Sequence, residues 1–132
     1  MLVVPNVGEV ELLKYILGMS EPDAPVIHLY TNEITPSNTT VKGDLTECST
    51  TGYVPITLVS ASWGVSTADQ VTTASYAEQT FTFGTNVSVW GYYVTDQSGT
   101  PKLLWAEKFS GAPFTIPDGG GTISITPKVT LN

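Results

Sequence analysis

The chain has 132 residues, of which 41% are hydrophobic and only 13% are charged, against about 25% charged in average proteins. Hydroxyl side chains replace much of the missing charge, since 20 Thr and 11 Ser accompany 12 Gly and 9 Pro. This composition is typical of short strands joined by tight turns and excludes an all-helical fold. Twelve acidic residues against five lysines and no arginine give a net charge of −7, so we expect no direct contact with nucleic acid.

Cysteine and histidine each occur once, as Cys48 and His28. One cysteine forms no intrachain disulfide, and one of each provides no zinc ligand set, so we expect no cofactor or metal. No apolar run approaches the roughly 20 residues of a membrane-spanning helix, and the first residues lack the basic start of a signal peptide. The sequence therefore predicts no membrane partner.

Residues 1–5 form an apolar arm that ends at a proline, and a helix is expected to follow over residues 7–17. Asn6 is a favoured N-cap, and Glu9 stands where a capping-box partner belongs. Apolar side chains then recur at helical spacing, and Gly18 occupies the position of a helix-ending glycine. The apolar residues are Leu12, Leu13, Ile16 and Leu17, with Val10 nearby.

After the proline-containing linker 20–25, the apolar pattern changes to a period of two, which predicts strands. Strands are expected over 26–31, weakly over 41–48 at an edge, over 53–59 with Pro55 at an edge or bend, and over 62–65. Further strands are expected over 75–84, 87–94, 103–110, 114–116 and 123–131, the last one bent at Pro127. The segment 87–94 is apolar on both faces, as in the centre of a sandwich.

This spacing, with turns about every ten residues, predicts an all-β fold of seven to nine strands. We expect an antiparallel β-sandwich, jelly-roll-like, with one short N-terminal helix. One domain is expected over 1–132, with the apolar arm and helix in 1–20 and the sandwich in 26–132.

A serine–histidine–aspartate triad is conceivable, but His28 lies in the middle of a strand and no nucleophile elbow is present. Calcium ligands near Asp44 and Glu47, or Asp96 and Ser98, lack the spacing of a calcium loop, so turn chemistry explains them better. A pair of carboxylates in a small glycosidase is the most serious enzymatic alternative. Its candidates are Glu78, Asp96, Glu107 and Asp118.

Aromatic residues are numerous and suggest either a core or a platform on which sugars stack. Core or interface roles are the commoner explanation in a small sandwich. The residues concerned are Trp63, Trp90, Trp105, Tyr53, Tyr76, Tyr92 and Tyr93. Of these we expect Trp90 to be buried, together with Phe83, because they lie in the two most apolar strands.

The N-terminus is the remaining anomaly, because apolar residues there exceed what one helix stripe needs. Two explanations are equally good: the arm and helix cap the open end of the sandwich, or they bind another chain. The candidate partner-binding residues are Leu2, Val3, Val4, Tyr15, Ile16 and Leu17.

Four stretches of the chain carry a resemblance to a known class of proteins. They are MLVVPNVGEVELLKYIL, VIHLYTNEITPS, GYVPITLVSASWGVS and GYYVTDQSGTPKLLWAEKFSGAPFTIPDGGGTISITPKVTLN. In them the chain resembles small virion structural proteins of tailed bacteriophages, including cyanobacterial and marine ones. The resemblance implies a β-sandwich subunit on a virion: first a capsid decoration (cement) protein, with tail or fibre subunits as further candidates. It implies no functional residues, because such proteins act through surfaces.

We therefore expect a non-enzymatic structural protein that forms homo-oligomers and stabilises a phage shell through contacts with other virion proteins, chiefly the major capsid protein. Its expected location is the virion, assembled in the host cytoplasm. The alternative is a module of a phage tail or fibre that binds carbohydrate or the host surface, and a small glycosidase is the third reading.

Overall fold

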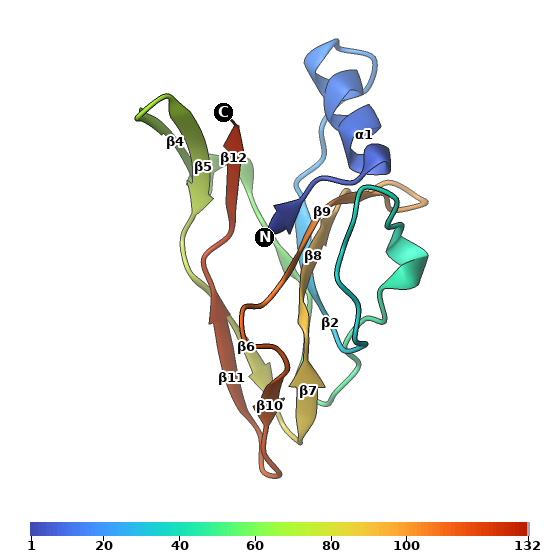
Figure 1. The fold of residues 1–132 in the computed structure, drawn as a ribbon, viewed down its shortest axis with the longest axis vertical. Helices are drawn as coiled ribbons and strands as arrows, with labels where there is room; N and C mark the ends of the chain where they lie inside the picture. The colour runs from blue at the N-terminus through green and yellow to red at the C-terminus, as the bar shows by residue number, and fades with distance from the viewer. Residues whose placement is uncertain (132) are drawn as a thin grey trace.

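The computed structural model describes residues 1–131 as an all-β fold with one short helix (Figure 1). The strands within this range are β1 Leu2–Val3, β2 Val26–Tyr30, β3 Ile56–Thr57, β4 Trp63–Ala68, β5 Val71–Tyr76, β6 Gln79–Phe83, β7 Val87–Val89, β8 Gly91–Thr95, β9 Leu103–Lys108, β10 Phe114–Ile116, β11 Gly121–Ile125 and β12 Lys128–Leu131. The helix, α1, spans Asn6–Ile16. All strand pairs are antiparallel, as the sequence predicts.

The first layer is a five-stranded sheet in the order β1-β9-β8-β2-β3. It continues into the pair β10-β7, because β7 and β8 are separated only by Trp90. Every residue of β8 is buried, which agrees with the apolar pattern over 87–94. Tyr92 and Val94 belong to the main core, while Tyr93 packs in a second cluster with Tyr30 and Leu45.

The second layer consists of two long, broken strands and one short one. β5 is followed at once by β6, and β11 by β12, with Pro127 at the break, where the sequence predicts a bend. β6 pairs with β11, and β5 pairs with both β12 and β4. Phe81, Phe83 and Ile125 from this layer join the main core with residues of the first sheet, which makes the arrangement sandwich-like.

The expected strand at 41–48 is wrong. Residues Lys42–Asp44 form a 3-10 turn, and only the single bridge between Tyr30 and Glu47 remains. The Asp44 carboxylate accepts the Val41 N–H at 2.9 Å, and such local bonds compete with strand pairing. The strand expected at 53–59 is also shorter than predicted: only Ile56 and Thr57, directly after Pro55, form a strand.

A hairpin of β4 and β5 replaces the short strand expected at 62–65. Its two-residue turn is Asp69–Gln70, and both residues have positive φ, 50° and 66°. The left-handed region normally calls for Gly or Asn in such a turn, so this pair gives little signal in the sequence. Figure 1 shows this hairpin with β12 projecting beyond the rest of the second layer, opposite α1.

Candidate functional site

The N-terminal helix lies against β9 and is held there by a glycine. Gly8 is the buried residue of α1, and a Cβ atom at this position would collide with the carbonyl oxygen of Leu104. The absence of a side chain therefore brings the helix backbone close to the strand. Leu12 and Tyr15 are half-buried on the same side of the helix.

A second contact, near the C-terminal end of α1, is made to the buried carboxylate of Asp96. Asp96 accepts the Lys102 N–H at 2.8 Å and the Ser98 hydroxyl at 2.9 Å, and Tyr15 donates to its other oxygen at 3.3 Å. Burial, with the neighbouring Asp96 carboxylate as a second cause, raises the pKa of Tyr15 to about 12. Tyr15 thus links α1 to the turn that follows β8.

The caps of α1 differ from the prediction at one end. Asn6 is the first helical residue, Pro5 takes the N-cap position, and no capping box forms. The Asn6 N–H is instead satisfied by the Asn38 carbonyl at 2.9 Å. At the other end Gly18 has φ 67°, and the Met19 and Gly18 N–H groups bond to Lys14 and Tyr15, which confirms the helix-ending glycine.

The opposite side of the helix is apolar and faces solvent. We call Val10, Leu13, Ile16 and Leu17 the outer face of α1; their exposed fractions are 51%, 58%, 79% and 68%. Met19, just beyond the helix, is 71% exposed. A surface helix of a free-standing domain normally turns charged residues outward. This outer face has no cover within residues 1–131.

The apolar arm turns inward. Leu2 and Val3 pair with Glu107 and Ala106 of β9, and the side chains of Leu2 and Val4 pack against the main core. Of the six candidate partner-binding residues, Leu2, Val3, Val4 and Tyr15 are therefore half-buried on their own chain, while Ile16 and Leu17 are exposed.

Sequence reasoning missed Val10, Leu13 and Met19 as part of this exposed surface. Leu13 was grouped with Leu12 in one set of apolar residues at helical spacing, yet the two side chains differ in burial. The i, i+3, i+7 spacing of Val10, Leu13 and Leu17 marks one helix stripe and was the available signal. The sequence alone does not show which side of α1 is buried. That side is set by Gly8, whose missing side chain lets the helix backbone lie close to Leu104 of β9.

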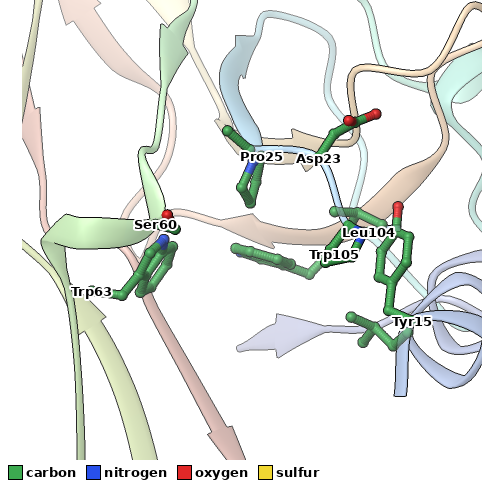
Figure 2. Close-up of a pocket in the computed structure, with 10 residues that line it drawn as sticks. Tyr15, Asp23, Pro25, Ser60, Trp63, Leu104 and Trp105 are labelled. Atoms are coloured by element: carbon green, nitrogen blue, oxygen red, sulfur yellow. The ribbon is translucent and has the colours of Figure 1, made fainter. Parts of the chain in front are cut away.

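A groove of about 340 Å³ opens beside the buried side of α1 (Figure 2). Leu12 and Tyr15 line it on the helix, Leu104 and Trp105 on β9, and Ser60 and Trp63 at the base of the projecting hairpin. The linker between α1 and β2 completes it. The rings of Trp63 and Trp105 meet edge to face, with centroids 6.4 Å apart. The groove is thus mostly apolar and aromatic.

The other aromatic residues are mainly core residues. Tyr76, Tyr92, Tyr93 and Trp105 are buried, and Tyr53 is half-buried and stacked near Phe81. Phe83 is buried, as expected. Trp90 is only half-buried and lies under the Lys108 ammonium, 5.1 Å from the ring centroid.

The hydrogen-bond partners of His28 are arranged as in a catalytic triad, with a carboxylate at one ring nitrogen and a hydroxyl at the other. Its Nδ1 lies 2.7 Å from Glu47 and its Nε2 lies 3.0 Å from the Thr95 hydroxyl. Tyr53 donates to the same Glu47 oxygen at 3.2 Å, and Tyr93 stacks on the imidazole at 4.7 Å. Thr95 is only 2% exposed, so a substrate has no access to its hydroxyl. The network instead ties β2 and β8 to the loop that carries Glu47.

The candidate acidic residues lie on separate elements. Glu78 and Asp118 are exposed, between β5 and β6 and in the turn before β11. Glu107 accepts the Tyr92 hydroxyl at 2.9 Å, and Asp96 is occupied as described above. Within residues 1–131 no three acidic, His or Cys side chains cluster as metal ligands would.

No helix among the described residues is long and apolar enough to cross a membrane. Comparison of the chain with protein-family models, with curated proteins and with solved structures found no match.

Proposed function

We propose that this chain is a non-enzymatic structural subunit of a tailed-phage particle, a capsid decoration protein that attaches to the shell through the outer face of α1. The observation that carries the proposal is that face itself: Val10, Leu13, Ile16 and Leu17 are all more than half exposed on one side of a well-anchored helix. Exposed apolar patches of this kind mark contact surfaces.

The contact would be apolar rather than electrostatic. Burial of a Leu or Ile side chain contributes about 1.5–3 kcal/mol, whereas none of the four side chains of the outer face of α1 carries a charge. Such a contact resists salt, because screening acts on charges and not on apolar burial. The partner we propose is the major capsid protein, and the proposed location is the virion, assembled in the host cytoplasm.

The proposal is tested with particles of a phage that encodes this chain, stripped of it and then incubated with purified protein. The double variant Leu13→Lys/Ile16→Lys should bind at least tenfold more weakly than the unaltered chain. It removes two apolar side chains that the proposed contact would bury, and their burial is worth more than about 1.4 kcal/mol together. Binding of the unaltered chain should persist in high salt.

The matched control is Val54→Lys, an equivalent change at a side chain that is 68% exposed in a loop away from α1. It should bind like the unaltered chain. Equal binding of all three proteins, or equal loss in the control, would rule out attachment through α1.

The groove favours a second candidate function, a carbohydrate-binding module of a tail or fibre. Trp63, Trp105 and Tyr15 provide aromatic surfaces there, and Asp23 and Ser60 provide polar groups. Trp105 is only 5% exposed, which limits the ring face open to a sugar. Titration with a panel of glycans, using Trp63→Ala as the comparison, separates this function from shell attachment.

A further inference from the structure

The hairpin of β4 and β5 has a free edge that the rest of the fold does not explain. β4 is the outermost strand in the order β12-β5-β4, and Figure 1 shows the hairpin of β4 and β5 projecting at the upper left of the molecule. Residues 64–68 are all exposed, and Val65 is 71% exposed. Such an edge presents unpaired N–H and C=O groups to any other strand.

The end strands of the large sheet and the outer strand β12 of the small sheet are protected edges. β1 and β3, at the two ends of the large sheet, have only two residues each; Pro55 directly precedes β3, and Pro5 lies two residues after β1. The outer edge of the small sheet, β12, starts with Lys128 directly after Pro127. Short strands, proline and lysine are the usual means by which natural sheets avoid pairing with each other. β4 has six residues and contains no proline and no charged residue.

The register shows which backbone groups face outward. The two-residue turn Asp69–Gln70 makes Ala68 and Val71 a hydrogen-bonded pair. Hydrogen-bonded and non-bonded pairs alternate along an antiparallel ladder, so the N–H and C=O groups of Val65 and Thr67 point away from β5. In agreement, Tyr76, which lies opposite Trp63, directs its N–H to Pro127 on the other side.

We infer that β4 pairs antiparallel with β4 of a second copy of this chain, with the two Val65 residues opposite each other. A strand paired with itself about a two-fold axis is its own complement, so no second sequence is needed. The result is one continuous sheet across the dimer, and the inference does not depend on how the chain attaches to a particle.

Charge distribution favours a second copy over a charged partner. The chain carries a net charge of −7, yet Asp69 is the one charged residue of the segment 63–76. With Val65 at the centre, the two Asp69 residues lie eight positions apart along the sheet, about 26 Å at about 3.3 Å per residue. This exceeds the Debye length of about 8 Å at physiological salt, so the two charges repel each other weakly.

The side chains along the strand also permit close approach. Gly64, Ser66 and Ala68 are small and lie on one face of β4. On the other face, Val65 would meet Val65, and Thr67 would meet Trp63. Cross-strand pairs of β-branched and aromatic residues of this kind stabilise sheets.

The first test is the mass of the full chain in solution, measured by sedimentation equilibrium across a range of concentrations. We expect a dimer for the unaltered chain. Val65→Lys should weaken the dimer at least tenfold, because it places two ammonium groups opposite each other on the paired edge. The matched control Leu131→Lys changes a side chain of nearly equal exposure, 72%, on β12 and should leave the dimer intact.

A second test reports the register directly. In a Cys48→Ala background, Val65→Cys should form an intermolecular disulfide under mild oxidation, because hydrogen-bonded partners have Cα atoms about 5.5 Å apart, within disulfide range. Leu131→Cys, equally exposed, should crosslink far more slowly. Circular dichroism of each variant confirms that it is folded.

Three results would overturn the inference: a monomer at every concentration, a dimer unaffected by Val65→Lys, or equal effects of Val65→Lys and Leu131→Lys. A dimer lost in Leu13→Lys and kept in Val65→Lys would overturn it too, because the contact would then be the outer face of α1.

The two proposals can fail independently of each other. A monomeric Val65→Lys chain that still binds particles would leave the proposed function intact.

Discussion

At the scale of single residues, Gly8 decides how α1 is seated. A methyl group there would meet the carbonyl of Leu104, and neither backbone can yield without displacing the helix. We expect Gly8→Ala to lower the free energy of unfolding by about 1–3 kcal/mol, although alanine favours a helix by about 1 kcal/mol over glycine. Urea unfolding measures the change.

Gly43→Ala is the matched control, because nothing lies within 4 Å of a Cβ atom at Gly43. Its free energy of unfolding should stay close to that of the unaltered chain. If Gly8→Ala proved as stable as the control, the close contact between α1 and β9 would be contradicted.

Tyr15 makes the docking of α1 sensitive to alkaline pH. Its pKa is raised from about 10 to about 12 in the folded chain by burial and then by Asp96. A group whose pKa is higher when folded contributes stability that is complete below pH 10 and is lost as the pH rises through 12. We expect the free energy of unfolding to fall over this range, and to fall less steeply in Tyr15→Phe.

Urea unfolding between pH 9 and 12 provides the measurement. Burial also raises the pKa values of Tyr30, Tyr53, Tyr92 and Tyr93, so the informative quantity is the difference between the two proteins. Identical slopes would mean that Tyr15 is not held by Asp96.

At the scale of secondary-structure elements, β6 connects the second layer to the core through Phe81 and Phe83. Phe83 is 2% exposed, so Phe83→Ala should cost about 3–5 kcal/mol of unfolding free energy. Trp90→Ala should cost less, because Trp90 is half-buried and partly covered by Lys108. Thermal unfolding ranks the two variants, and the reverse order would contradict this account of the core.

The periodic spacing of apolar residues predicted the helix and those strands whose side chains are buried in the core. The helix and the fully buried β8 appear where the apolar pattern puts them. The hairpin of β4 and β5 was missed because exposed Ser, Thr and Ala give no alternation, and Asp69–Gln70 is an unusual turn. The strand expected at 41–48 failed because Asp44 bonds locally to Val41.

At the scale of the whole molecule, the fold separates its apolar surface into a core and one outward helix face. The sequence could predict that the N-terminal 20 residues hold excess apolar side chains, but it left open whether they cap the sandwich or bind another chain. In the structure Ile16 and Leu17 are exposed. The sequence could not predict that Leu2 and Val4 pack inward, because that depends on pairing with β9, a hundred residues further along the chain.

The same limit applies to His28. Glu47 and Thr95 are 19 and 67 residues away in sequence, so only the folded chain brings them to the imidazole. Their order resembles a triad, but the buried hydroxyl of Thr95 gives the network a structural role.

The central claim is that the outer face of α1 joins this chain to a phage particle. Electron cryomicroscopy of particles from a phage that encodes the chain tests it most directly. We expect density for the chain on the shell in many copies, with Leu13, Ile16 and Leu17 against a neighbouring capsid subunit. Particles that lack the chain, or a bound chain whose α1 face points to solvent, would contradict the claim.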